Sequence, residues 1–156
     1  MILRKATEKD KEKVAEVLLE LLNVDNIEEA EKSFLKEINK GDNYILAEEN
    51  GKILGLVSWI MHGRPKHGLV ELYHIVTLKG GRGKGTGRKL FESMMKDIEK
   101  AYKKHDANVR KVFLLTRSTN KDAHAFYEKL GFKHETVLKE HFYKNEHEFV
   151  FSMIFE

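Results

Sequence analysis

The stretch that decides the fold is Lys79-Gly80-Gly81-Arg82-Gly83-Lys84-Gly85-Thr86-Gly87-Arg88-Lys89. It places five glycines within the eight residues 80 to 87. A strand pattern from Leu69 to Leu78 precedes it, and an apolar stripe at helical spacing follows it. A turn from a strand into a helix directs backbone N–H groups and the positive end of the helix dipole toward one place. The stretch therefore predicts a phosphate-binding turn in an α/β protein.

Spacing separates the phosphate-binding motifs that compete for this turn. A Walker A loop needs Ser or Thr directly after its Gly-Lys pair, and here Gly85 follows that pair. A dinucleotide fingerprint needs a last glycine where this chain has Thr86 or Arg88. The pattern that fits is Arg-x-x-Gly-x-Gly, formed by Arg82, Gly85 and Gly87. A basic loop without a ligand stays open as the alternative.

Hydrophobic periodicity predicts the elements on either side of this turn. We expect strands at residues 2–5, 44–48, 53–60, 69–78, 112–115, near 132–142 and at 148–155. We expect helices over 7–21, 27–40, from the glycine-rich turn to about 102, and over 120–130. This order predicts an α/β (α+β) fold in which about four helices cover a mixed sheet of about seven strands. We expect one domain over residues 1–156.

Turn and cap residues mark the ends of several elements. Thr7 with Asp10 resembles a capping box at the start of the first helix. Gly41 predicts the end of the second helix, and Asn50-Gly51 is the strongest short signal for a β-hairpin. Asn145 predicts the turn between the last two strands.

Composition excludes several classes of chemistry. The chain has no cysteine, which removes disulfides, thiolate metal sites and a cysteine nucleophile. It has no His-Glu-x-x-His pair, so we expect no metal site. No apolar run approaches the roughly 20 residues that span a bilayer, and the N-terminus lacks a secretory signal, so we expect a cytoplasmic protein. The net charge of +3 is weak support for nucleic acid and adequate for a phosphorylated cofactor.

A second motif lies downstream of the glycine-rich turn. It consists of an Asn, an Ala, a Phe-Tyr pair and a Gly-Phe pair at Asn120, Ala123, Phe126-Tyr127 and Gly131-Phe132. With both motifs in this order and a strand between them, the chain resembles the GNAT superfamily of acyl-CoA-dependent N-acyltransferases. The resemblance covers nearly the whole chain, and it implies a GNAT-like, splayed central sheet.

The resemblance also implies where acetyl-CoA would bind. Backbone amides of the turn would hold its pyrophosphate, namely those of Arg82, Gly83, Lys84, Gly85, Thr86 and Gly87. The strand end at Ile75, Val76 and Thr77 would pair with the pantetheine arm like an added strand. Asn120 would contact that arm, or it would cap the following helix, and both roles stay open.

The implied reaction is direct attack of a primary amine on the acetyl group through a tetrahedral intermediate. An alkyl ammonium has a pKa of about 10.4, so freeing its lone pair near pH 7 needs a base or a water chain. Glu71, on the same strand face as Tyr73, is the candidate base, and pairing with Lys or Arg is its structural alternative. Tyr127 occupies the family's general-acid position and would also contact the cofactor, with a purely aromatic core role as its alternative.

Two classes of acceptor stay open: a small amine, or the N-terminus of a peptide or protein. Tyr73 and His141 are candidate acceptor contacts, and Tyr73, His74 and His141 are lesser candidates for the base. The consecutive Glu-Asp of polyamine acetyltransferases is replaced by Glu71-Leu72, which weakens the polyamine alternative. A non-catalytic acyl-CoA binder and, less favoured, a basic nucleic-acid-binding module remain alternatives. A homodimer is left open.

Overall fold

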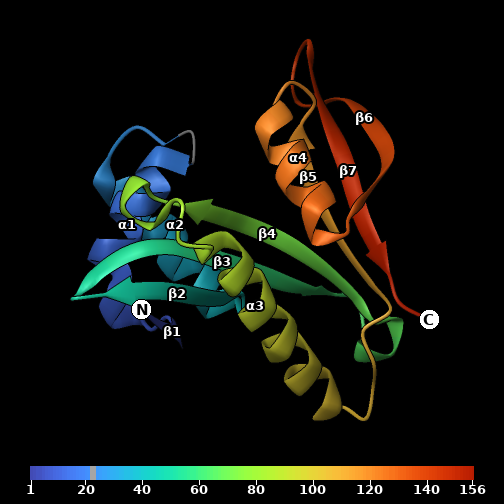
Figure 1. Cartoon of the computed structure of the whole chain (residues 1–156), viewed down its shortest axis with the longest axis horizontal. Helices are drawn as coiled ribbons and strands as arrows, with labels where there is room; N and C mark the ends of the chain where they lie inside the picture. The colour runs from blue at the N-terminus through green and yellow to red at the C-terminus, as the bar shows by residue number, and fades with distance from the viewer. Residues whose placement is uncertain (22–23) are drawn as a thin grey trace. The chain divides into compact units, whose positions relative to one another are not determined.

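The computed structural model describes residues 1–21 and 24–156, and its elements follow the predicted order (Figure 1). The strands are β1 Ile2–Lys5, β2 Asn43–Glu49, β3 Lys52–His62, β4 Leu69–Thr77, β5 Lys111–Arg117, β6 Lys133–Tyr143 and β7 Glu146–Ile154. The α-helices are α1 Lys11–Leu21, α2 Ile27–Lys40, α3 Thr86–Lys103 and α4 Lys121–Leu130. Short 3-10 helices are η1 Glu8–Asp10, η2 Pro65–His67 and η3 Lys79–Gly81. Among the described residues, no helix has the length and apolar character needed to cross a bilayer.

The strands form one seven-stranded sheet in the order β1-β2-β3-β4-β5-β7-β6. The pairs β1–β2, β2–β3, β5–β7 and β6–β7 are antiparallel, whereas β4–β5 is parallel. The β4–β5 ladder holds the pairs Leu69–Lys111, Val70–Val112 and Glu71–Phe113. Both strands continue beyond this ladder, β4 to Thr77 and β5 to Arg117. The mixed sheet with four helices confirms the predicted fold class.

The chain divides into two compact units, which we describe separately. Unit 1 comprises Met1–Ile60 and His74–Ile98, and unit 2 comprises Met61–Tyr73 and Glu99–Glu156. The chain passes from one unit to the other within β3, β4 and α3. The single domain predicted over residues 1–156 stays a prediction.

Unit 1 packs helices on both faces of β3, because successive residues of a strand face opposite sides. Leu56 belongs to a buried cluster with apolar residues of α1 and α2, including Phe34. On the opposite face, Trp59 Nε1 donates to Asp97 of α3 at 2.9 Å. Burying a side chain of this size contributes about 1.5–3 kcal/mol, so these contacts hold the helices on the sheet.

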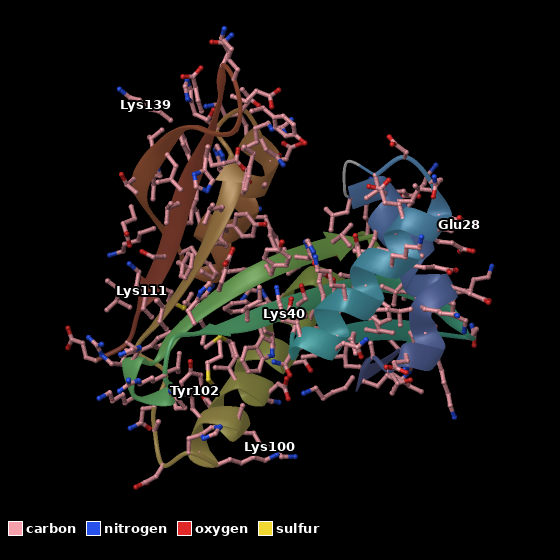
Figure 2. The ribbon with its side chains drawn as sticks, turned by 180° about the vertical axis from the view of Figure 1, so that it is seen from behind. Glu28, Lys40, Lys100, Tyr102, Lys111 and Lys139 are labelled. Carbon is pink, nitrogen blue, oxygen red and sulfur yellow. The ribbon has the colours of Figure 1, made fainter. Side chains whose placement is uncertain are left out.

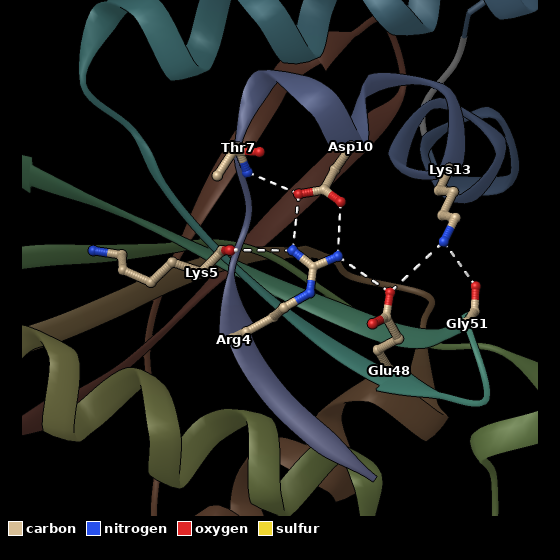
Figure 3. A network of polar contacts seen from close by, with 7 residues as sticks. All are labelled: Arg4, Lys5, Thr7, Asp10, Lys13, Glu48 and Gly51. Atoms are coloured by element: carbon tan, nitrogen blue, oxygen red, sulfur yellow. Dashed lines mark hydrogen bonds and ion pairs between the residues drawn. The ribbon is translucent and has the colours of Figure 1, made fainter.

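Polar contacts tie β1 to the start of α1 (Figure 3). The Arg4 guanidinium donates to both carboxylate oxygens of Asp10 at 2.9 and 2.7 Å and to Glu48 at 3.1 Å. Asp10 also accepts from the backbone N–H of Thr7 at 2.8 Å, as the predicted capping box requires. Lys13 Nζ lies 3.7 Å from Glu48 Oε2. The guanidinium lowers the pKa of Asp10, so the carboxylate stays charged.

The predicted turn and cap residues have the backbone conformations that their chemistry favours. The predicted Gly41 ends α2 at a φ of 106°, and Asn26, which was not predicted as a cap, accepts from the Glu29 N–H at the start of that helix. Asn50 and Gly51 have φ values of 52° and 76°, as a tight hairpin turn needs. Asn145 has a φ of 64° in the turn between β6 and β7.

Unit 2 is built on β5, β7 and β6 with α4. Strand β5 pairs with β7 from Lys111–Ile154 to Arg117–Glu148, and its inward side chains Val112 and Leu114 are buried. Tyr102, at the end of α3 and labelled in Figure 2, is buried, and its hydroxyl lies 3.3 Å from the Leu69 carbonyl oxygen. Strand β6 is an edge strand whose side chains are almost all exposed.

Candidate active site

The glycine-rich turn lies in unit 1, between β4 and α3. Gly83 and Gly85 have φ values of 78° and 71°, a region that residues with a Cβ rarely adopt. Gly81 is needed for packing, since a Cβ there would lie 2.8 Å from the Leu54 carbonyl oxygen. The glycines therefore serve both the shape of the turn and its close approach to β3.

Side chains of the turn hold it against the neighbouring elements. The buried Thr86 hydroxyl donates to the Gly81 carbonyl at 2.7 Å, which closes the turn at the first residue of α3. Arg82 Nε donates to the Thr77 carbonyl at 3.3 Å, so the turn contacts the strand end predicted to bind pantetheine. The Leu78 N–H donates to Leu54 O at 2.8 Å. These hydrogen bonds hold the turn against β3 and the end of β4.

The electrostatics of the turn suit an anion. The first turn of α3 contains no acidic residue, and helix N-termini present unsatisfied N–H groups with partial positive charge. Space is open where a Cβ would stand on Gly83 or Gly85, with no heavy atom within 4 Å. Lys84 lies in the same turn, and its Nζ is 3.2 Å from Glu49 Oε2. A pyrophosphate therefore fits the residues present.

Glu71 lies on β4 in unit 2, and its partner is a histidine. Glu71 Oε1 is 2.8 Å from His62 Nε2 at the end of β3. We expected Lys or Arg as the structural partner of Glu71, and His62 was not among the predicted site residues. No local pattern could identify this histidine, because its position beside Glu71 depends on how β3 and β4 align.

Tyr127 lies on α4 in unit 2 among aromatic rings. The ring centroids of Phe126, Phe132 and Phe151 are 5.6, 6.0 and 6.1 Å from that of Tyr127. Burial raises the pKa of the Tyr127 phenol to about 12. At neutral pH the phenol is therefore a hydrogen-bond donor and a poor source of protons.

Three further predicted site residues also lie in unit 2. Asn120 caps α4 by accepting from the Ala123 N–H at 3.1 Å, so its structural role is realised. Tyr73 is 43% exposed, and His141 is exposed on β6 with its ring 4.6 Å from that of Phe142. Exposure leaves both side chains accessible to an acceptor, and their roles stay predictions.

A buried polar cluster in unit 1 was only partly anticipated. His74 Nε2 lies 3.5 Å from Glu37 Oε1, and Tyr44 donates its hydroxyl proton to the same carboxylate. The His74 N–H donates to Ser58 Oγ at 3.1 Å. Sequence reasoning named His74 but missed Glu37 and Tyr44, which come from α2 and β2 and carry no motif. Among the described residues, no group of His, Asp and Glu side chains could hold a metal ion.

Comparison with known proteins identifies the family. The sequence profile of the acetyltransferase (GNAT) family matches residues 12–132, which is most of the chain and includes both motifs. The chain therefore belongs to the GNAT acetyltransferase family, whose members use acetyl-CoA. A search of curated proteins found no match.

Solved structures of low sequence identity share the fold. A ribosomal-protein-alanine N-acetyltransferase from Brucella melitensis is 18% identical, with 99% of this chain and 100% of that chain covered at a TM-score of 0.77. An aminoglycoside 6'-N-acetyltransferase complexed with coenzyme A is 15% identical, with 99% and 97% covered at 0.81. A spermidine N-acetyltransferase mutant from Vibrio cholerae is 20% identical, with 99% and 95% covered at 0.78.

Proposed function

We propose that this chain transfers the acetyl group of acetyl-CoA to a primary amine, and that the turn from Arg82 to Gly87 holds the pyrophosphate. The shape of the turn carries the proposal. Gly83 and Gly85 adopt positive φ values, open space lies beside both, and the N-terminus of α3 follows at once. Backbone N–H groups with no side chain in front of them suit a bulky anion. Ile75, Val76 and Thr77 lead into the turn and would pair with the pantetheine arm.

When bound, acetyl-CoA supplies the acetyl group already activated as a thioester, so the protein's task is to prepare the amine. At pH 7 an alkyl ammonium must lose a proton at a free-energy cost of about 5 kcal/mol, from its pKa of about 10.4. We assign this proton to the Glu71 carboxylate, either directly or through water. General-base catalysis of this kind contributes about 10²–10⁴ in rate.

Tyr127 and Asn120 have supporting roles in this proposal. Because burial raises the pKa of Tyr127 to about 12, its phenol is a weaker acid than a thiol of about 8.5 by roughly 5 kcal/mol. Tyr127 would therefore stabilise the departing thiolate with a hydrogen bond and keep its proton. Asn120 would contact the pantetheine arm while it caps α4.

The acceptor is proposed at the level of its class, a small amine or a peptide or protein N-terminus. Tyr73 and His141 are proposed acceptor contacts because both are exposed in unit 2. The names of the structural neighbours supply a practical panel of probes. Spermidine, an aminoglycoside and a peptide that starts with alanine cover the three acceptor types in those names.

Calorimetric titration with acetyl-CoA tests the cofactor site first. We expect Arg82→Ala to weaken binding about tenfold and Gly85→Glu to abolish it, because a carboxylate would occupy the open space. Lys100→Ala is the matched control, since Lys100 is an exposed cation near the other end of α3 (Figure 2). Failure of the wild-type protein to bind acetyl-CoA at any salt concentration would overturn the proposal.

Release of free CoA thiol with the three probes then tests catalysis. We expect turnover with at least one probe and a loss of about 10²–10³ in kcat for Glu71→Gln. Binding of acetyl-CoA without turnover of any amine would favour the non-catalytic acyl-CoA binder. Strongly salt-dependent binding of DNA or RNA in place of acetyl-CoA would favour the nucleic-acid alternative.

A further inference from the structure

His62 and Glu71 form a carboxylate–imidazole pair within unit 2. The side chain of Glu71 is 15% exposed and that of His62 is 40% exposed, and His62 Nε2 lies 2.8 Å from Glu71 Oε1. An ionised carboxylate can only accept a hydrogen bond, so the Nε2 of a neutral His62 carries the proton. The other carboxylate oxygen of Glu71 is then the one available to take a proton.

The surroundings of His62 hold its ring in place on one side and leave it accessible on another. The ring of Phe113 lies 5.4 Å from it, and Phe113 is also the register partner of Glu71 on β5. His62 lines an open cavity of about 320 Å³. The residues around this cavity are His62, Gly63, His67, Leu69, Arg110, Lys111 and Ile154.

The charges that face His62 come from several elements. Glu71 contacts it from β4, and the cavity that His62 lines is also lined by His67 of η2, Arg110 before β5 and Lys111 of β5. Lys111 is itself paired with Glu135 of β6 at 2.7 Å. Of these groups, Glu71 is within hydrogen-bond distance of the His62 ring, so it is the direct partner.

We propose that His62 is a positioning residue that orients the Glu71 carboxylate during acetyl transfer. The inference rests on the proposed function, in which Glu71 is the base. The N–H bond of the ammonium breaks, its proton passes to the free oxygen of Glu71, and solvent later removes it. A neutral His62 fixes the other oxygen through its Nε2–H. A protonated His62 makes the same contact but adds a positive charge, which opposes protonation of the carboxylate.

Variants at position 62 separate the hydrogen bond from the charge. His62→Leu removes both, and we expect kcat to fall about tenfold or more across the pH range. His62→Gln keeps an N–H donor but cannot titrate, so we expect kcat near the wild-type value above pH 7 and a changed acid limb in the pH–rate profile. Thermal unfolding of each variant shows whether it is folded.

His67→Gln is the matched control for these variants. His67 lines the same cavity, but its Nδ1 accepts from the Arg64 N–H at 3.0 Å and it is not the partner of Glu71. We expect His67→Gln to keep the wild-type profile. If His62→Gln and His62→Leu also keep that profile while Glu71→Gln is inactive, the base is correct and the role of His62 is overturned.

A measurement without an acceptor tests the pair independently of turnover. Nitrogen-15 NMR of the histidine rings should show His62 in the Nε2–H form, with an N–H proton that exchanges slowly. Glu71→Leu should speed this exchange at His62 and leave His67 unchanged. Equal spectra for the wild type and Glu71→Leu would overturn the pair even if the protein proved inactive toward every amine.

Discussion

Lys84 and Glu49 form an ion pair across unit 1, with Nζ 3.2 Å from Oε2, and this pair places a carboxylate beside the proposed pyrophosphate site. The Lys84 ammonium lowers the pKa of Glu49, so the carboxylate is charged at neutral pH. A negative charge here repels an incoming anion and competes with it for Lys84. If the turn holds the pyrophosphate as proposed, the pair would therefore oppose the binding of acetyl-CoA.

We accordingly expect Glu49→Gln to bind acetyl-CoA about two- to fivefold more tightly at low salt, by the usual size of exposed charge effects. The gain should shrink at 0.5 M salt, where the Debye length is only about 4 Å. Calorimetry at the two salt concentrations measures this, and Glu20→Gln on the exposed side of α1 is the control. Weaker binding by Glu49→Gln would instead mean that Glu49 holds Lys84 in its working position.

Alanine substitution tests the role of the positive φ of Gly85, with Gly41 as the matched control position. Both residues have positive φ values, 71° and 106°, and neither would bring a Cβ within 4 Å of another heavy atom. Alanine at either position should cost about 1–2 kcal/mol of unfolding free energy, because residues with a Cβ avoid this region. Only Gly85→Ala should also weaken acetyl-CoA binding, by about tenfold. Equal affinity of the two variants for acetyl-CoA would show that the pyrophosphate does not bind beside Gly85.

Asn120 is expected to show both of its roles in two different measurements. Asn120→Ala should lose about 1 kcal/mol of stability, because the Ala123 N–H loses its cap, whereas Asn120→Ser should keep most of it. If Asn120 also contacts the pantetheine arm, both variants should bind acetyl-CoA several-fold more weakly. Denaturant unfolding and calorimetry measure the two effects. Unchanged affinity in Asn120→Ser would leave Asn120 with the capping role alone.

Local chemistry explains which parts of the fold could be predicted from the sequence. Gly41, Gly131 and the Asn50-Gly51 turn adopt positive φ values, which few other residues tolerate, so the sequence marks these ends directly. Gly83 and Gly85 mark the turn in the same way. The predicted order of strands and helices depends on such ends and on periodicity, and the structure confirms it.

Contacts between distant segments could not be predicted in this way. The His62–Glu71 pair depends on the alignment of β3 with β4, which the length and shape of the segment between them determine. Glu37 and Tyr44 meet His74 only because α2 packs on the sheet. Neither contact has a sequence signal of its own, since lone His and Glu residues occur on many surfaces. Glu71 was predicted as the base from the family resemblance, and that role stays a prediction, whereas its contact with His62 is seen only in the structure.

The Arg4–Asp10 pair predicts how unit 1 responds to acid. Arg4 lowers the pKa of Asp10, so the pair stabilises the fold at pH values above the unfolded pKa of about 3.9. This contribution is lost as the pH falls through the lower folded value. Asp10→Asn should therefore cost about 2 kcal/mol at pH 7, and its difference from wild type should shrink as the pH falls below the unfolded pKa. Urea unfolding at several pH values measures this, with Asp25→Asn as the exposed control. A difference that is constant with pH would exclude the ion pair as its cause.

The buried phenol of Tyr127 should make the stability of the fold depend on pH in the alkaline range. Its pKa is raised to about 12 in the folded protein, against about 10 in the unfolded chain. A group whose pKa is raised by folding stabilises the fold below the unfolded pKa, and this contribution is lost as the pH rises through the folded value. Between pH 10 and 12, wild type should therefore lose roughly 3 kcal/mol more stability than Tyr127→Phe.

The kinetics of Tyr127→Phe show whether the Tyr127 phenol acts in catalysis as a hydrogen-bond donor or as a proton donor. A phenol that keeps its proton contributes one hydrogen bond to the departing thiolate, so Tyr127→Phe should reduce kcat by about tenfold, in line with a bond to a charged group of roughly 1.5–3 kcal/mol. The alkaline limb of the pH–rate profile should then be the same in both proteins up to about pH 10. A loss near 10⁴, or an alkaline limb that disappears in Tyr127→Phe, would show that Tyr127 transfers its proton after all. In that case acetyl-CoA or the acceptor must lower the pKa of Tyr127 from the value set by its aromatic surroundings.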